Sequence, residues 1–521
     1  MNNLFKNMDR RTFMQTAAAA GVVAGSMGMR SIALASDGGT FTFGRTRETS
    51  HLDPHRSQLS SSWHIQHMVY DSLVTLDDNF DVQPQLAESW EWQGNDLTFT
   101  IRKGVKFANG REMTMDDVVG SLNRALKSKG NPWGLLLRNK TGITSSGNKL
   151  TISFSGPNNV ALTALTATLV CIIPMKEVED GSWDPNTDQF LGTGPFYVTN
   201  HVANDRWELA ANPHYWGGKQ GVSNVVVRTI PEVNSLVAAL RDGSIDAAAF
   251  DSNPDAPDLI AGEPNISSAT MNTTDFNYVG MNAISANSPF TDIRVRQAVA
   301  LVLDRQKIVD FAFGGRAEIT YGWTQWGLTD DSKLKFRDPD VERAKALIAE
   351  ADPKVTSFPY LVRGGSNHGQ IAQVVKQQLA LIGLDAQLET VDGGVWAKRV
   401  WGTRPESDMI MTNSAYTGFA HPLVTAHWWA PDLSRFTGGY VPENPDYTAA
   451  LNDATTAAAG SDVVPSLQRL YEIYNEQAIK IPLCVNTETI AWRSDRVDMT
   501  PSNKQAQNDI INGVENYKMK V

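Results

Sequence analysis

Four of the nine histidines lie within one short stretch, at spacings that could bring imidazole nitrogens to a metal ion. They are His51, His55, His64 and His67. The last two would share one face of a helix, and imidazole is a common ligand of borderline divalent metals. No carboxylate or thiol stands beside them at a recognised ligand spacing, so hydrogen-bonded or surface histidines are the alternative to an exported metal-binding protein or enzyme that uses this cluster.

Oxygen ligands also occupy the first, third, fifth and twelfth places of a loop that resembles a calcium-binding EF-hand. These residues are Asp77, Asn79, Asp81 and Glu88. The sixth place, where the sharp turn of an EF-hand needs glycine, is Val82. A polar turn between two strands explains the pattern better than a calcium site.

Common catalytic signatures are missing from the sequence. It has no Gly-x-Ser-x-Gly elbow, His-Glu-x-x-His, Cys-x-x-Cys, Walker loop or dinucleotide fingerprint. The run GTGP at 192–195 resembles a phosphate loop, but the following FYV predicts a strand, so no helix N-terminus would hold an anion there. We therefore expect a protein without enzymatic activity and without a cofactor.

One stretch combines a cation with a predicted helix start. The run RGGSN at 363–367 leads into a helix expected near Gln370. The guanidinium of Arg363 and free amides near Asn367 would form an anion trap suited to a ligand carboxylate. The alternative is a surface arginine before an ordinary glycine-rich turn.

Several of the fourteen tryptophans fall in predicted loops or next to glycines. Most aromatic side chains belong to protein cores, yet tryptophans in loops suit a cleft that grips an apolar or ring-shaped ligand surface. The tryptophans considered for this role are Trp323, Trp326, Trp396, Trp401, Trp428 and Trp429.

The elements that would position these residues alternate along the chain, which is typical of an α/β fold. Residues 40–44 and 98–102 read as strands, and residues 60–73 and 115–127 read as helical patterns. The clearest helices are predicted at 231–242, 292–309, 338–351 and 370–382. Strand candidates follow at 247–250 and 384–390, which predicts sheets covered by helices.

The first 35 residues have the composition of an export signal. Lys6, Arg10 and Arg11 precede an uncharged stretch rich in alanine and glycine, and Ala-Leu-Ala at 33–35 ends it. The pair Arg10-Arg11 resembles a twin-arginine signal, which implies the twin-arginine export machinery as a partner and the periplasm as the destination. A membrane anchor is the alternative, although the stretch is only weakly apolar.

The acidic composition argues against nucleic acid as a partner. The chain has a net charge of -11, and removing residues 1–35, which hold four basic residues and one acidic residue, leaves -14. Such a surface repels phosphate backbones. The two cysteines, Cys171 and Cys484, are too few for a disulfide scaffold, so one bridge and two buried thiols both remain open.

Blocks along the mature chain resemble the peptide/nickel class of solute-binding proteins of ABC importers, which is family 5 of the bacterial extracellular solute-binding proteins. They occur in the family's order, and together they cover almost the whole chain. The blocks are PQLAESWE at 84–91, LTFTIRKGVKF at 97–107, DDVV at 116–119, GTGPF at 192–196, NPHYWG at 212–217, GSIDA at 243–247 and DIRVRQA at 292–298.

This resemblance implies a two-lobed α/β clamp of the periplasmic-binding-protein type. The first lobe would contain residues 36–275 and 478–521, with an extra subdomain at about 66–189. The second lobe would contain residues 276–477. The lobes would close on a ligand about a two-segment hinge and present the closed form to the permease.

The resemblance also implies where the ligand binds. Peptide-binding relatives hold the ligand's α-amine with an Asp, but the matching run YTGFAHP at 416–422 has Phe419 there. Their carboxylate-binding Arg falls near Arg363. The loop 58–63 resembles a segment that faces the ligand. The expected substrate-binding residues are Gln58, Ser60, Trp63, Arg363, Asn367, Trp396, Tyr416 and Phe419.

We therefore expect a monomeric periplasmic protein that delivers a small solute to the permease subunits of an ABC transporter. The missing acid at 419 argues against a simple dipeptide with a free amine. A modified peptide, an opine-like conjugate or an oligosaccharide, carrying a carboxylate, is the expected ligand. A chemosensory binding protein is an alternative to a transport component.

Overall fold

The computed structural model describes residues 38–49, 52–57, 60–78, 81–127, 133–137, 139–186, 190–322, 330–364, 367–401, 408–416, 422–430, 439–457, 464–501 and 513–520. All of these belong to one compact unit, Gly38–Val521. The predicted export signal lies outside the described residues. No helix in the described ranges is long and apolar enough to cross a membrane.

A ten-stranded sheet organises the unit, and its strand order mixes segments that are far apart in sequence. The strands, in spatial order, are β14 (Asp385–Val391), β13 (Ser357–Arg363), β15 (Met411–Tyr416), β12 (Ile266–Met281), β16 (Lys480–Arg493), β11 (Ala247–Ala249), β1 (Thr40–Arg45), β10 (Asn224–Thr229), β9 (Arg206–Ala211) and β8 (Phe196–Val202). The strands predicted at 40–44, 247–250 and 384–390 are therefore confirmed.

Two groups of parallel strands lie within this sheet. In one, β1 pairs in parallel with β10 and with β11. In the other, β13 pairs in parallel with β14 and with β15. The mixed α/β class expected from the sequence is confirmed.

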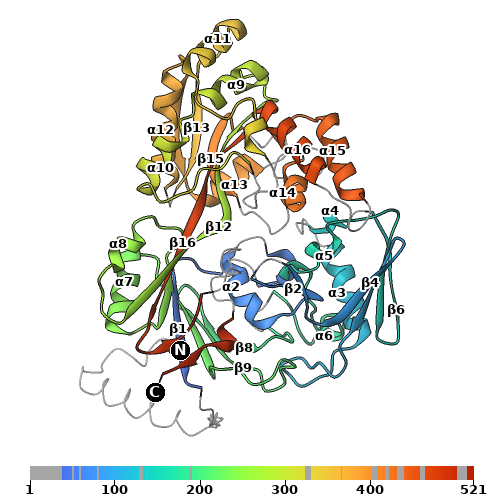
Figure 1. Ribbon diagram of the computed structural model, residues 1–521. Coiled ribbons are helices and arrows are strands. Elements are labelled where there is room, and N and C mark those ends of the chain that lie inside the picture. Colours follow the sequence, from blue (N-terminus) through green and yellow to red (C-terminus); the bar gives the residue numbers. More distant parts are fainter. Residues whose placement is uncertain are drawn as a thin grey trace, which may run out of the picture. The chain divides into compact units, whose positions relative to one another are not determined.

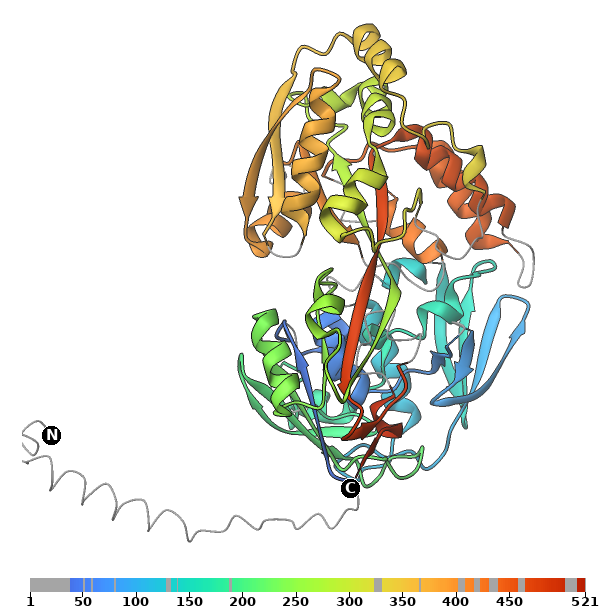
Figure 2. The ribbon, with the colours of Figure 1, turned by 60° about the vertical axis from the view of Figure 1, so that its left-hand side comes forward.

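The long strands β12 and β16 connect the two groups. They pair antiparallel from Ile266 with Arg493 to Gly280 with Lys480, and they run side by side between the two groups (Figures 1 and 2). The register shifts between Asn272 and Phe276, where residues 273–275 stand opposite Asn486. The register shifts again between Asn277 and Tyr278. Extra residues on one strand bend a ladder, so the connection is irregular at these two places.

Helices cover the sheet. α12 packs against β13, β14 and β15, and α13 packs against β13, with α9, α10 and α11 in the same half of the molecule (Figure 1). In the other half, α7 packs against β11, and α8 packs against β12 and β16. The helices of the unit outside the small subdomain described below are α2 (Ser60–Val69), α7 (Val233–Asp242), α8 (Ala256–Ile260), α9 (Ile293–Val302), α10 (Arg305–Phe313), α11 (Val341–Ala351), α12 (His368–Ala380), α13 (Gly393–Trp401), α14 (Pro422–Trp429), α15 (Pro445–Thr456) and α16 (Val464–Gln477).

The helix predicted at 292–309 is wrong as a single element. Two helices, α9 and α10, occupy this range, because Asp304 leaves the helical conformation and accepts a hydrogen bond from the Lys307 amide (3.2 Å) as the N-cap of α10. Asp292 caps α9 in the same way, accepting from the Arg294 amide at 2.8 Å. A continuous apolar periodicity thus concealed an internal cap.

A smaller four-stranded antiparallel sheet forms a subdomain. Its order is β4 (Ala87–Gln93), β5 (Asp96–Ile101), β7 (Lys149–Phe154) and β6 (Lys140–Ser146). Its helices are α3 (Met115–Lys127), α4 (Trp133–Leu136), α5 (Ala161–Ala164) and α6 (Met175–Asp180).

The remaining short elements of the unit are β2 (Val74–Leu76), β3 (Val82–Pro84), β17 (Val497–Asp498), β18 (Lys518–Met519), η1 (Pro54–Arg56), η2 (Thr168–Val170), η3 (Pro289–Thr291), η4 (Asp331–Lys333) and η6 (Val514–Asn516).

The EF-hand-like residues form the turn that the sequence favoured. Strands β2 and β3 pair antiparallel on either side of it. The Asp81 amide donates to Oδ1 of Asp77 at 3.0 Å, and the Asp77 amide donates to the Asp81 carbonyl at 2.9 Å. Asn79 lies outside the described residues.

The GTGP run is a packing motif before a strand, as predicted. Strand β8 begins at Phe196, directly after it. A Cβ atom added to Gly192 would lie 2.0 Å from the Val69 carbonyl oxygen, and one added to Gly194 would lie 2.7 Å from the Val69 carbonyl carbon. Glycine at both positions therefore lets the loop approach the end of α2.

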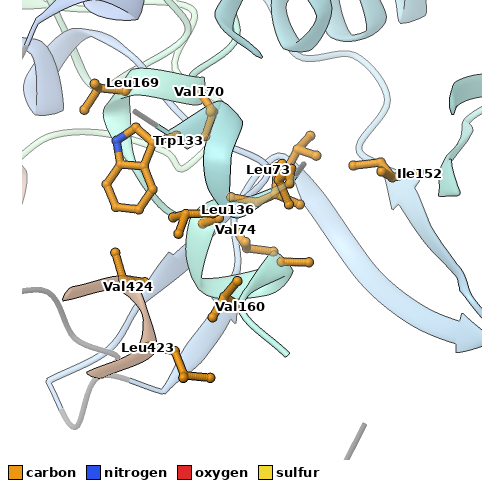
Figure 3. Packing of buried hydrophobic residues seen from close by; sticks show 14 of the residues in the cluster. Leu73, Val74, Trp133, Leu136, Ile152, Val160, Leu169, Val170, Leu423 and Val424 are labelled. Carbon is orange, nitrogen blue, oxygen red and sulfur yellow. The ribbon is translucent and has the colours of Figure 1, made fainter. Parts of the chain in front are cut away.

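A continuous hydrophobic cluster joins the subdomain to α14, α15 and α16. In Figure 3, Trp133 and Leu136 of α4 lie in the same group as Leu423 and Val424 of α14. Asn159 adds polar contacts, because its side chain donates to the carbonyls of Ala454 (3.3 Å) and Ala457 (2.8 Å) at the C-terminal end of α15. These contacts satisfy carbonyl groups that a helix end leaves without partners.

Both cysteines are buried free thiols, so the bridge considered from the sequence is not formed. Cys171 packs in a cluster with strands β1, β9 and β10, whereas Cys484 packs with α9, α10 and α12. Burial raises the pKa of Cys484 to about 12. Both thiols are therefore protonated at neutral pH.

Arg124 of α3 fastens the subdomain to the segment before α2. Its guanidinium donates to both oxygens of Asp53, at 3.0 and 2.7 Å, and to Nδ1 of His55 at 2.9 Å. Nε2 of His55 lies 2.9 Å from the Cys171 carbonyl, which only accepts, so Nε2 carries the hydrogen and Nδ1 accepts. Burial lowers the pKa of His55 to about 4, consistent with a neutral ring.

Lys480, the first residue of β16, is buried among aromatic rings. Its Nζ lies 4.6 Å from the Trp429 ring centroid and 5.4 Å from those of Tyr278 and Tyr440. The faces of such rings attract a cation, but burial lowers the pKa of Lys480 to about 7. The side chain is therefore close to its titration point at neutral pH.

Replacing Arg124 with Met should lower the free energy of unfolding by about 2–3 kcal/mol, because it leaves the buried Asp53 carboxylate without its cation. Urea unfolding followed by tryptophan fluorescence measures the loss. The exposed Lys127 at the end of the same helix supplies the control Lys127→Met. Equal stability of the two variants would contradict the role of Arg124.

Replacing Lys480 with Met should raise the free energy of unfolding at pH 7, and this gain should shrink as the pH approaches 10. The unfolded lysine keeps its proton up to about pH 10.4, whereas the folded one loses it near pH 7, so wild-type stability rises with pH in that window. Urea midpoints at pH 7 and 9.5 for both proteins test this. A difference between the two proteins that does not change with pH would refute it.

Candidate functional site

The site lies where the carboxyl ends of two groups of parallel strands meet. In one group, β1 ends at Arg45 and β11 at Ala249, and in the other, β13 ends at Arg363 and β15 at Tyr416. Ligands of open α/β sheets bind beyond the carboxyl ends of the strands. Charged residues follow or end three of these four strands, so both groups present charge at this edge.

Arg47 and Asp251 form the first wall of the site. Nη2 of Arg47 donates to Oδ1 of Asp251 in a direct ion pair. These residues line a small cavity together with Arg45, Thr46, His64, Ala249 and Glu488. The carboxylate of Glu488, on β16, accepts hydrogen bonds from the amides of Phe250 (2.8 Å) and Ser252 (2.7 Å), which flank Asp251.

Arg45 anchors helix α2 beside this wall. The buried guanidinium donates to the Ser61 carbonyl at 2.5 Å and to Oε1 of Glu48 at 3.3 Å. Trp207 donates to the same Glu48 oxygen at 2.9 Å. Burial lowers the pKa of Arg45 to about 10, with Glu48 opposing that shift. The start of α2 is thereby fixed to the carboxyl end of β1.

Arg363 forms the second wall. Its guanidinium carbon lies 5.9 Å from the Trp396 ring centroid. Burial lowers the pKa of Arg363 most, the charge of Arg47 lowers it further, and Asp251 acts in the opposite direction. Arg363 and the Arg47–Asp251 pair therefore act on each other across the site.

The ring of Trp396 lies against the guanidinium of Arg363. Trp396 is itself almost fully buried, with 1% of its surface exposed. Its indole nitrogen donates to Oγ1 of Thr412 at 2.8 Å, and its ring packs edge to face on Trp401 at 5.3 Å. Trp396 therefore helps to position Arg363. Its predicted role as a direct contact stays a prediction.

The predicted anion trap at 363–367 is only partly within the described residues, because 365 and 366 lie outside them. Asn367 is buried at the N-cap of α12, and its amide donates to the Ala312 carbonyl at 3.4 Å. The next residue, His368, has a pKa lowered to about 4 by burial, with Arg363 and Arg47 adding to the effect. A neutral imidazole thus stands at the start of α12, near the two arginines.

Of the other predicted site residues, Trp63 lies in the core, and the side chains of the rest are not described. Trp63 is buried in the cluster of the subdomain, and its indole nitrogen lies 3.4 Å from the Ser57 carbonyl, to which it donates. Gln58 and Phe419, the tryptophans at 323 and 326, and the side chains of Ser60, Tyr416 and Trp428 lie outside the described part. Their contacts with a ligand stay predictions.

The histidine stretch does not form a metal centre in the part of the chain that the structure describes. His55 uses both ring nitrogens in the Arg124 and Cys171 contacts. Among the described residues, no group of three or more His, Cys, Asp or Glu could hold a metal ion. His51 lies outside the described residues.

Arg47, Asp251 and Glu488 were missed by sequence reasoning. A usable signal existed for two of them, because Arg47 and Asp251 stand just after the strands predicted at 40–44 and 247–250. Charged residues directly after parallel strands are candidates for ligand contacts. Glu488 offered no such signal, since it lies inside a strand and about 240 residues from its partners.

Comparisons with known proteins agree with this architecture. The oligopeptide-binding protein AppA of Bacillus subtilis (strain 168) is 28% identical over 385 residues, which cover 68% of this chain and 69% of AppA. Heme-binding protein A of Haemophilus influenzae is 25% identical over 460 residues, covering 80% of this chain and 81% of that protein.

A solved structure extends the likeness in fold. The protein AgaA of A. tumefaciens R10, in complex with agropinic acid, superposes with a TM-score of 0.81 at 23% identity, covering 93% of this chain and 99% of that one. At this identity the likeness establishes the fold alone. The two-lobed clamp expected from the sequence is thereby confirmed.

Residues 81–433 match the family described as bacterial extracellular solute-binding proteins, family 5 (middle region). This match covers more than half of the chain and confirms the resemblance seen in the sequence blocks. The protein therefore belongs to the family 5 bacterial extracellular solute-binding proteins, and it is a binding protein rather than an enzyme.

Proposed function

We propose that this protein captures a small organic solute carrying a carboxylate and delivers it to the permease subunits of an ABC importer. The observation that carries the proposal is the placement of Arg363. It ends β13 at the carboxyl end of its group of parallel strands, is partly buried, and is acted on by the charge of another arginine, Arg47. An anion between these two cations would relieve their repulsion.

The chemistry of the guanidinium supports a carboxylate as its partner. Trp396 covers one side of Arg363, which leaves the planar N–H edge for a bidentate contact. Charge-assisted pairs of this kind are about twice as strong as neutral hydrogen bonds, and a partly dry site strengthens them further. A neutral ligand would leave the charge of Arg363 uncompensated.

The proposed ligand is a modified peptide, an opine-like amino-acid conjugate or an oligosaccharide that carries such a group. Support comes from relatives that are named for oligopeptides and from a similar structure solved with agropinic acid. The phenylalanine at 419 argues for a ligand whose α-amine is masked or absent. Gln58, Ser60, Trp63, Tyr416 and Phe419 are the further proposed contacts.

Capture would proceed by closure of two lobes about β12 and β16. We assign residues 36–275 and 478–521 to the first lobe and 276–477 to the second. Because Ile481, Leu483 and Cys484 pack with α9, α10 and α12, the second crossing belongs nearer to Asn486. Ligand that touches both walls would shift the population towards the closed form.

The proposed site of action is the periplasm, which the protein would reach as a folded monomer through the twin-arginine machinery. The support is the Arg10-Arg11 pair and the weakly apolar stretch after it. Both ends of the described unit also pack together, since Phe41 stacks edge to face on Tyr517 at 5.4 Å. The lobe that holds both ends therefore needs nearly the whole chain before it completes its core.

Replacing Arg363 with Ala should weaken a carboxylate ligand by about 2 kcal/mol or more, since a desolvated charge pair is lost. The ligand is first found by thermal-shift screening of residues 36–521 against peptides, N-acetylated peptides, opines and acidic oligosaccharides. Calorimetry then compares the variants. Arg343→Ala, an exposed arginine of α11, is the matched control.

Unchanged affinity after Arg363→Ala would remove this residue from the site. A screen in which peptides with free amines bind best would contradict the role proposed for position 419.

Replacing Arg10 and Arg11 together with Lys should abolish export of the full chain, because the twin-arginine route depends on that pair. Cell fractionation and immunoblotting measure the periplasmic share. Lys6→Arg, which keeps the charge of the leader, is the control. Normal export of the double variant would refute this route and favour another one.

A further inference from the structure

Asp251 stands on the first wall directly after β11, at the carboxyl edge of three parallel strands. Its side chain is 32% exposed, so a ligand can reach it. It bonds to Arg47 through Oδ1, and a carboxylate has room for further donors, because its two oxygens offer about four acceptor positions. The proposed anion contact, Arg363, lies on the opposite wall.

The backbone around Asp251 holds this carboxylate in a defined direction. Asp251 and Ser252 both have positive φ angles, 53° and 56°, in the left-handed region that non-glycine residues seldom adopt. The buried Glu488 accepts from the amides on either side of Asp251, at 2.8 and 2.7 Å. A strained turn persists only where its surroundings determine it, and here the long strand β16 supplies that support.

The two walls carry charges of opposite sign, Asp251 on the first and Arg363 on the second. Asp251 favours the charged form of Arg363, while Arg47 opposes it, so a carboxylate and a guanidinium act on each other across the site. A ligand that brings only an anion would satisfy Arg363 and compete with Asp251. A ligand with both charges would satisfy both walls.

We propose that Asp251 binds a cationic group of the ligand and that the solute is therefore zwitterionic. Its carboxylate contacts Arg363, and a guanidinium or ammonium group on a side chain contacts Asp251. This inference rests on the function proposed above, and it adds a positive charge to the carboxylate already proposed for the ligand. It also supplies the acid that position 419, a phenylalanine, does not provide.

Two probes that differ in one charge test the inference. They are N-acetyl-alanyl-arginine and N-acetyl-alanyl-citrulline, which share their length, their carboxylate and a masked α-amine. The guanidinium of the first is replaced by a neutral ureido group of nearly the same shape in the second. Calorimetry on residues 36–521 gives the ratio of the two affinities.

The wild-type protein should prefer the arginine probe by about tenfold or more, the scale of one charge-assisted contact. Asp251→Asn should bring the ratio close to one, chiefly because the arginine probe loses its contact. Asp205→Asn is the matched control, because Asp205 also pairs with an arginine, Arg206 (2.5 Å), but lies on the exposed turn between β8 and β9. It should keep the wild-type ratio.

Arg47→Met provides a second variant, because it removes the cation that shares Asp251. It should raise the ratio in favour of the arginine probe. If Arg47 and Asp251 formed only a structural pair, this substitution and Asp251→Asn would change stability and leave the ratio as it is.

Equal binding of the two probes, a ratio unchanged in Asp251→Asn, or binding of neither probe would each overturn the inference. Arg363→Ala separates this outcome from failure of the proposed function. If the probes bind equally and Arg363→Ala weakens both, the anion site stands and only the role of Asp251 is lost. If Arg363→Ala leaves both affinities unchanged, the proposed function itself fails.

Discussion

The antiparallel pairing of β12 with β16 is the constraint on which the rest of the molecule depends. β12 pairs with β15 of one group of parallel strands and β16 pairs with β11 of the other, so their shared ladder joins the strand that ends at Arg363 to the group that contains β1 and β11. The ladder is regular except where residues 273–275 stand opposite Asn486 and at the next shift, between Asn277 and Tyr278. A ladder that is regular outside one short irregular stretch combines a stiff connection with a place to bend, which a clamp requires.

Charge is distributed around the site so that neither wall is balanced by itself. Arg363 and Arg47 repel each other, and Asp251 and the buried Glu488 lie close together on the first wall. Burial raises the pKa of Glu488 to about 7, and Asp251 adds to that shift. Like charges held near each other are costly within a protein, and they are typical of sites that a charged ligand completes.

The sequence predicted local elements well and the site only in part. Apolar periodicity and caps located most helices, because these signals act over a few residues. They failed at Asp304, where the apolar pattern continues across a cap. Arg363 was found through the glycine-rich run beside it and the family motif, whereas Asp251 and Glu488 were not, since their roles arise from contacts between segments about 240 residues apart.

By itself, the sequence determined the α/β class, the family and the absence of the common catalytic motifs, because periodicity, ordered blocks and motif spacing are properties of a linear chain. Only the tertiary structure decided that the cysteines stay apart, that His55 bonds to Arg124 and Cys171, and that the charges of Arg47 and Asp251 act on Arg363. The physical reason is that burial and charge–charge interactions depend on which residues are neighbours in space. Strand pairing decides which charges meet, and no local pattern in the chain records that pairing.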